Sequence, residues 1–150
     1  MQTIKRLTNA FENAEVIEFD KDSKYIFLSD CHRGDGSHSD EFTKNQNLYL
    51  HALNYYYQNG FTYVEVGDGD ELWEQPKFKF IKKAHHDVFE AIKKFHYHHK
   101  LIMIYGNHNM YLKDPEYVEK YYYTYYNEYR EQRYDFLKNL KPVEAIILKH

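Results

Sequence analysis

Three strand-sized segments, separated by stretches of helical periodicity, constrain the fold of this chain more than any other feature. Residues 24–29, 61–66 and 101–105 are runs rich in apolar, aromatic and β-branched residues, which is typical of buried strands. The stretches 40–59 and 76–95 between them carry apolar residues at helical spacing. Strands that alternate with helices predict an α/β fold, a layered β-sheet with flanking helices, in which ligands bind beyond the carboxyl ends of the strands.

Further segments and helix-end signals extend this order of elements. Residues 16–19 and 143–148 are candidate strands at the two ends of the chain. Gly60 suits the position just after the first helix. Asp114 followed by Pro115 predicts the start of a third helix, because Asp caps a helix and Pro is tolerated at its first position.

Composition limits the classes of function. The 150 residues, 43% hydrophobic and 29% charged, suit one globular domain that spans residues 1–150. The net charge of −3 offers no basic excess for nucleic acid. The single cysteine excludes an internal disulfide, and the sequence has neither a signal-peptide pattern nor a run of membrane-spanning length. We therefore expect a cytoplasmic protein.

Tyrosine is frequent, with 17 copies, and many of them lie between Tyr121 and Tyr134. We interpret this stretch as an amphipathic helix that buries the ring bodies and keeps the hydroxyl groups in water. The alternative is a stacking or partner-binding surface. The sequence favours the helix, because no basic groove accompanies the tyrosines.

Each of the three central strands ends in a polar cluster. The clusters are Asp30-Cys31-His32, Gly67-Asp68 and Gly106-Asn107-His108. Because alternate residues of an extended chain point to the same side, Asp30 and His32 can converge on one ion. Two carboxylates, an imidazole and an amide oxygen form a mixed ligand set that suits Mn²⁺, Fe or Zn²⁺. The sequence therefore predicts a metal site, in which a carboxylate such as that of Asp68 can bridge two ions.

The three clusters, in this order, resemble the D-x-H, G-D and G-N-H-(D/E) series of the calcineurin-like metallophosphoesterases. The strings LSDCHRGDG and VGDGDELWE are similar to those of bacterial members with unassigned substrates. The resemblance covers about residues 24–112 and implies the first half of that family's αββα sandwich. It also implies two divalent metal ions (Mn, Fe or Zn), no organic cofactor, and hydrolysis of a phosphomonoester or phosphodiester by metal-activated hydroxide. The substrate would be a phosphorylated small molecule or a nucleotide.

The resemblance implies a role for each matching residue. Asp30 and His32 would bind the first metal ion, and Asp68 would bridge the two ions. Asn107 would bind the second ion. His108 would contact the phosphate and help the leaving group to depart, a task that suits an imidazole near neutral pH.

One departure from the family pattern lies beside the predicted catalytic histidine. Asn109 stands where the family has Asp or Glu, and an acidic neighbour would orient His108 and stabilise its protonated form. An amide offers no charge. We therefore expect a lowered pKa for His108 and slower turnover.

A second departure concerns the end of the chain. The family supplies further metal-binding histidines in a G-H and a G-H-x-H motif, whereas only His150 follows His108 here. The sequence therefore predicts a domain that lacks its C-terminal part. The alternative function is a non-catalytic fragment that binds metal weakly or serves as an interaction module. Uncovered apolar strand faces would then favour self-association or a complementing chain.

Several residues beside the motifs have two interpretations. Arg33 would either bind a phosphate oxygen or form a surface ion pair. Asp35 and Asp70 would either orient metal ligands or serve as turn residues. Trp73 would line a substrate cleft or pack beneath its loop, and Cys31 is most simply a small packed residue.

Overall fold

A three-stranded parallel sheet forms the centre of the computed structural model, which describes residues 2–150. The strands β2 (Tyr25–Leu28), β3 (Thr62–Val66) and β4 (Leu101–Ile104) lie in the order β2-β3-β4. Each parallel step is connected through helices, as parallel pairing requires. The chain is thus an α/β protein, and the three central strands agree with the sequence prediction to within two residues at each end.

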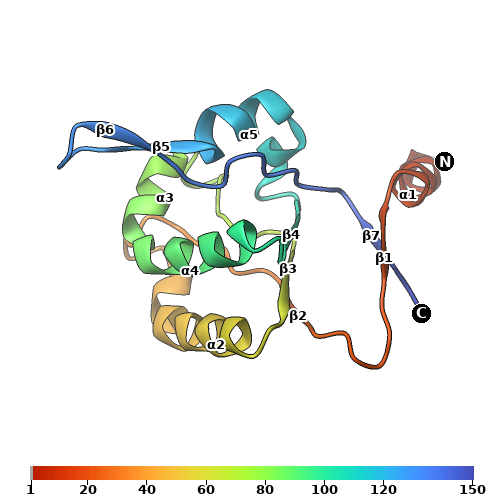
Figure 1. The fold of residues 1–150 in the computed structure, drawn as a ribbon. Coiled ribbons are helices and arrows are strands. Elements are labelled where there is room, and N and C mark those ends of the chain that lie inside the picture. Colours follow the sequence, from red (N-terminus) through yellow and green to blue (C-terminus); the bar gives the residue numbers. More distant parts are fainter. Residues whose placement is uncertain (1) are drawn as a thin grey trace.

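Two helices cover one face of this sheet (Figure 1). They are α2 (Gln46–Gln58) and α4 (His86–Tyr97), which contact β3 and β4 respectively and also contact each other. Alternate strand residues such as Tyr63 and Met103 point into this layer and are buried there. Burial of apolar side chains between helices and sheet is the main stabilising contribution to the domain.

The predicted helix 76–95 is two helices, α3 (Phe78–Ala84) and α4, with a break at His85. The imidazole of His85 is fully buried and lies 2.6 Å from Asp40 Oδ2 and 2.7 Å from Gln46 Oε1. These buried polar contacts accompany the non-helical backbone of His85, with φ of −117° and ψ of 38°. Asp40 itself caps a 3-10 helix, η1 (Glu41–Asn45), by accepting a hydrogen bond from the Phe42 amide.

The tyrosine-rich stretch is not one helix, and that prediction was wrong. A 3-10 helix, η2 (Met110–Lys113), precedes helix α5 (Pro115–Tyr122), which begins with the predicted Asp114 cap and ends at Tyr122. A hairpin of β5 (Thr124–Asn127) and β6 (Gln132–Asp135) follows. Tyr125 and Tyr134 are cross-strand partners whose rings stack at 5.8 Å. Aromatic pairs of this kind favour antiparallel strands, so tertiary pairing prevails over helical periodicity.

The two ends of the chain form a separate unit beyond the other face of the sheet (Figure 1). Strand β1 (Glu15–Glu18) pairs in parallel with β7 (Ile146–Lys149), and α1 (Gln2–Glu12) precedes β1. The predicted strand 143–148 is thereby divided: Val143 bridges to Ile104 of β4, and pairing with β1 begins at Ile146.

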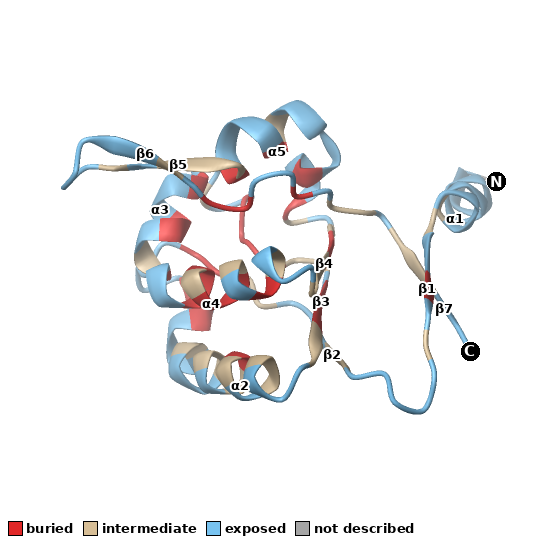
Figure 2. Cartoon of the chain, viewed as in Figure 1, coloured by how far each residue is buried: buried red, intermediate tan, exposed pale blue. Residues whose placement is uncertain are grey.

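The second face of the central sheet is only partly covered. Phe27 and Val66 on this face are 41% and 37% exposed, and α1 has no buried residue (Figure 2). Parallel sheets are usually covered on both faces, so this face is unusual for an α/β protein. None of the helices within residues 2–150 has the length and apolar character that crossing a membrane requires.

Truncation of Leu53 should destabilise the domain, because this side chain of α2 is fully buried in the core. We expect Leu53→Ala to lower the free energy of unfolding by about 2–5 kcal/mol, through lost burial and the cavity left behind. Leu48→Ala in the same helix is the matched control: Leu48 is 72% exposed, and its truncation should change stability by no more than about 0.5 kcal/mol. Urea denaturation measures both, and equal effects would contradict this packing of α2.

Candidate metal centre

Three loops meet at the carboxyl ends of β2, β3 and β4. The Asp30 amide donates to the Gly67 carbonyl at 3.2 Å, and the His32 amide donates to the Asp68 carbonyl at 2.9 Å. The Gly67 amide in turn donates to the Ile104 carbonyl at 3.0 Å. Parallel neighbours in register carry their polar clusters to one edge of the sheet, which is where ligands bind in open α/β folds.

The backbone of the first two loops is not extended as the sequence analysis expected. Asp30, His32 and Asp68 have φ values of 53°, 47° and 48°, in the left-handed region that residues other than glycine rarely adopt. Such strained positions persist only where surrounding contacts hold them, and they concentrate at functional sites. Asp30 and His32 still converge, with Asp30 Oδ1 at 3.7 Å from His32 Nε2, although a turn and not strand alternation brings them together.

Asp30, His32 and Asp68 form a group of potential metal ligands. One ligand atom from each residue lies within 4.8 Å of the others. Two carboxylates and one imidazole are a donor set that divalent Mn, Fe and Zn accept, so these residues fit one such cation. The fourth predicted ligand, Asn107, is exposed in the turn between Gly106 and His108.

The third loop holds the Asp68 carboxylate from the other side. The backbone amide of His108 donates to Asp68 Oδ1 at 2.8 Å. Gly106 lies so close that a Cβ atom there would be 2.2 Å from the same oxygen. The glycine of the third cluster is therefore required for the close approach of this loop to Asp68.

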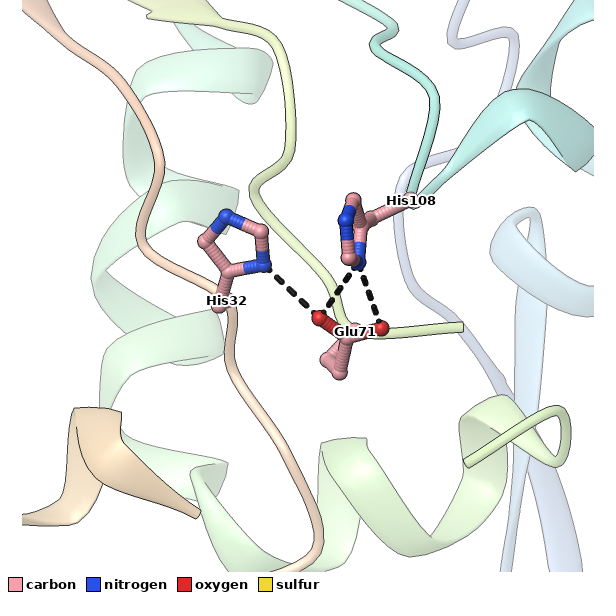
Figure 3. Close-up of side chains that lie close together, drawn as sticks. All are labelled: His32, Glu71 and His108. Carbon is pink, nitrogen blue, oxygen red and sulfur yellow. Dashed lines mark hydrogen bonds and ion pairs between the residues drawn. The ribbon is translucent and has the colours of Figure 1, made fainter. Parts of the chain in front are cut away.

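Glu71 contacts the two histidines of the site, and no sequence pattern predicted a role for it. His32 Nδ1 lies 2.7 Å from Glu71 Oε2, and His108 Nδ1 lies 2.8 and 2.7 Å from the two carboxylate oxygens (Figure 3). His32, Glu71 and His108 also form a second group of potential metal ligands. The only sequence signal for Glu71 is its acidic character three residues after Asp68, in a loop that already carries a motif.

The sequence predicts a lowered pKa for His108 because Asn109 is uncharged, but the carboxylate of Glu71 raises this pKa. The hydrogen bond that His108 donates to Glu71 raises the pKa of His108 above its ordinary value, and the charge of Glu71 adds to this effect. The predicted lowering of the His108 pKa was therefore wrong. Asn109 is buried, and its Oδ1 accepts a hydrogen bond from the Gly106 amide at 2.6 Å, so it shapes the turn and not the imidazole.

Arg33 is fully buried, which corrects both of its predicted roles. Its Nε donates to Asp70 Oδ1 at 2.7 Å, and its terminal nitrogens donate to Glu65 at 2.7 and 2.8 Å. Burial alone would lower the pKa of Arg33, but Asp70 and Glu65 raise it well above its ordinary value. Arg33 is thus neither a phosphate ligand nor a surface ion pair. It is the cation of a buried ionic network.

Of the two roles that the sequence left open for Asp35, the structure supports the turn residue. Asp70 contacts Arg33 and Tyr122 and not a predicted metal ligand, and exposed Asp35 accepts a hydrogen bond from the Ser37 amide as a turn residue. Neither orients a metal ligand. Trp73 does not pack beneath its loop, because it is 59% exposed and its ring lies 4.2 Å from that of His108.

Cys31 is the packed residue that the sequence predicted. It lies against the hydrophobic core, and burial raises the pKa of its thiol to about 11. The thiolate form that would bind metal is thereby disfavoured.

Comparison with known proteins assigns this chain to no group. No protein-family model, no curated protein and no solved structure matches it.

Loss of the buried guanidinium group of Arg33 should destabilise the fold strongly. We expect Arg33→Ala to lower the free energy of unfolding by about 3–5 kcal/mol, because Glu65 and Asp70 would remain buried without a compensating charge. Lys138→Ala is the control, since Lys138 pairs with Asp135 at the surface and such pairs contribute at most about 1 kcal/mol. Chemical denaturation compares the two, and a change in Arg33→Ala no larger than in the control would contradict the network.

His108 should titrate above pH 6.5 in the metal-free protein, because Glu71 stabilises its protonated ring. Two-dimensional NMR of the histidine rings measures the midpoint. We expect Glu71→Gln to lower the midpoint clearly, and Glu74→Gln, which removes a more distant charge of the same loop, to lower it less. A midpoint that Glu71→Gln leaves unchanged would contradict the assigned contact.

The contact between Glu71 and His108 should stabilise the fold only within a pH window. Burial opposes ionisation of Glu71, but the hydrogen bonds from His108 and His32 outweigh it and lower the pKa of Glu71 below 4.5. The Glu71 contribution is therefore present above pH 4.5 and is lost as the pH falls through its folded-state pKa. The His108 contribution is present below pH 6.5 and is lost as the pH rises through its raised pKa.

Proposed function

We propose that this chain is a metal-dependent phosphoesterase of the calcineurin-like type, which hydrolyses a phosphomonoester or phosphodiester. The observation that carries the proposal is the convergence of Asp30, His32 and Asp68 at the carboxyl edge of a parallel sheet, with His108 on the adjoining loop. The order of these residues along the chain is the order of the family's motifs.

The fold supports this proposal. Helices α2 and α4 cover one face of the sheet, and the second face is left partly open, as expected for the first half of an αββα sandwich.

The chemistry of the site follows from the residues present. Asp30, His32 and Asp68 would hold a divalent cation, and Asn107 is the further ligand that the motif supplies for a second one. When bound, Mn, Fe or Zn neutralises the charge of a phosphoryl group and makes water a better nucleophile at neutral pH.

His108 would act on the leaving group. Its Nδ1 is bound to Glu71, which leaves Nε2 as the atom that can donate a proton to a departing oxygen. The raised pKa of His108 keeps more of the ring protonated near neutral pH, as a general acid requires.

A second candidate is a non-catalytic domain that binds one cation weakly or pairs with another chain. Two observations favour it. Asp30, His32 and Asp68 form a group of three potential ligands, and the sheet face with Phe27 and Val66 is partly exposed. Three ligand side chains hold one cation, and two cations would need more.

Hydrolysis of p-nitrophenyl phosphate and of its bis ester tests the two candidates. We expect turnover by the purified chain to require added Mn²⁺ and to fall at least about 100-fold in Asp68→Asn, because charge stabilisation worth several kcal/mol depends on the bound cation. Asn tolerates the left-handed backbone of residue 68, so the variant removes charge and not the turn.

Lys138→Ala serves as the control and should retain full activity, since Lys138 lies in an exposed surface pair. Turnover that survives a chelator or persists in Asp68→Asn would contradict a metal-dependent site at these residues. Elemental analysis with no bound metal, together with no turnover, would support the non-catalytic candidate.

A further inference from the structure

Loop 34–40 begins two positions after His32 and forms one wall of a small recess beside the candidate site. Asp35 and Ser39 line the recess from this loop, and His32 lines it from the site. Gln75 lines it from the loop after β3, and its side-chain amide donates to Asp35 Oδ2 at 2.9 Å. The position of loop 34–40 therefore determines the shape of the space next to His32.

The carboxylate of Asp40 organises this loop from within. Its Oδ2 accepts a hydrogen bond from the Gly36 amide at 2.8 Å, whereas its Oδ1 accepts from the Phe42 amide and caps η1. Gly34 passes so close that a Cβ atom there would lie 2.9 Å from Asp40 Cγ. The Asp40 side chain is fully buried, so its remaining hydrogen bond has to come from another protein group.

His85 supplies that hydrogen bond from the break between α3 and α4. Its Nε2 lies 2.6 Å from Asp40 Oδ2, and the imidazole is fully buried. Burial opposes the ionisation of Asp40, but the hydrogen bonds from the Gly36 amide and from His85 outweigh it and lower the pKa of Asp40 below its ordinary value. Because an ionised carboxylate only accepts hydrogen bonds, Nε2 of His85 is the donor.

The imidazole of His85 is itself fixed by its surroundings. Its Nδ1 lies 2.7 Å from Gln46 Oε1 at the start of α2, and the Phe42 ring meets it edge-on at 5.0 Å and 85°. The backbone of His85 is anchored in both neighbouring helices, since its amide donates to the Ile81 carbonyl at 3.0 Å and its carbonyl accepts from the Phe89 amide at 3.1 Å. The ring therefore links the helix layer to the loop through a single carboxylate.

We propose that His85 is a positioning residue: by donating to Asp40 it holds loop 34–40 as a wall of the space that the substrate enters beside the candidate metal centre. His85 does not line the recess, whereas Asp40 does, so His85 acts through Asp40. That the recess receives part of a substrate rests on the proposed function. The contact that holds the loop rests on the geometry of this chain alone.

Hydrogen exchange of the backbone amides tests the contact without reference to activity. In His85→Asn the side chain is too short to reach Asp40, and we expect the Gly36 amide, which shares Oδ2 with His85, to exchange at least about 10-fold faster. In His85→Gln the longer side-chain amide can donate to Asp40 as Nε2 does, so exchange should stay within about 2-fold of the wild type. His86→Asn is the matched control, because His86 is the exposed neighbour, and it should leave the exchange unchanged.

Long-range ¹H–¹⁵N NMR of the histidine rings is a second readout that needs no variant. In the wild-type chain we expect a proton on Nε2 of His85 that exchanges slowly with water, because the ring is fully buried against Asp40. A His85 ring that carries its proton on Nδ1 alone would overturn the proposal, since Nε2 could then not donate to Asp40.

Steady-state kinetics with p-nitrophenyl phosphate at saturating Mn²⁺ separates positioning from a purely structural role. A displaced wall weakens the binding of substrate more than the chemical step, so we expect His85→Asn to raise KM by about 5–10-fold while kcat changes less than about 2-fold. His85→Gln should restore the wild-type KM. Thermal melting identifies a variant that has lost its fold.

Two further outcomes would overturn the inference. Unchanged exchange of the Gly36 amide in folded His85→Asn would show that His85 does not hold the loop. Faster exchange with an unchanged KM would make His85 a structural residue only. If His85→Asn does not fold, the wild-type ring spectrum and the exchange in His85→Gln decide. Failure of the proposed function is distinguishable: a wild-type chain without turnover contradicts the phosphoesterase, while exchange and the ring spectrum still decide whether His85 holds the loop.

Discussion

Arg33 donates hydrogen bonds to two carboxylates that are buried beneath the loops of the candidate site, and the geometry above them depends on this interaction. Glu65 comes from β3 and Asp70 from the loop after it, while Arg33 follows the first polar cluster. Tyr63 and Tyr122 donate further hydrogen bonds to the carboxylates. A buried charge is tolerated only when it is paired and hydrogen-bonded, so the network fixes where the first loop lies relative to the second.

This constraint extends to the conformation of the candidate metal ligands. Asp30, His32 and Asp68 occupy the left-handed region, a conformation that is unfavourable for non-glycine residues and that surrounding contacts have to maintain. A Cβ atom on Gly69 would lie 1.9 Å from Glu65 Oε1, so the turn can pass over the network only with glycine at this position. The ionic network, the glycines and the strained turns together hold these three side chains in place, which is the pre-organisation that a functional site needs.

Glu71 supplies His108 with a negative charge from a residue that is distant in the sequence. The amide of Asn109 offers no charge to His108, yet a carboxylate from another loop reaches the same imidazole and also the imidazole of His32. The order of residues along the chain did not reveal this, because Glu71 and His108 are 37 positions apart and become neighbours only when β3 and β4 pair.

The sequence by itself determined the α/β class, the three central strands and the clusters that follow them, because hydrophobic periodicity and strand-end glycines are local properties. The tertiary structure decided what depends on contacts between distant residues. It placed Arg33 in a buried network, ended α5 before the hairpin of Tyr125 and Tyr134, and brought Glu71 between two histidines. Burial and cross-strand pairing outweigh local preference at these positions, since desolvation of charges and packing of aromatic rings involve larger free energies than helix propensity.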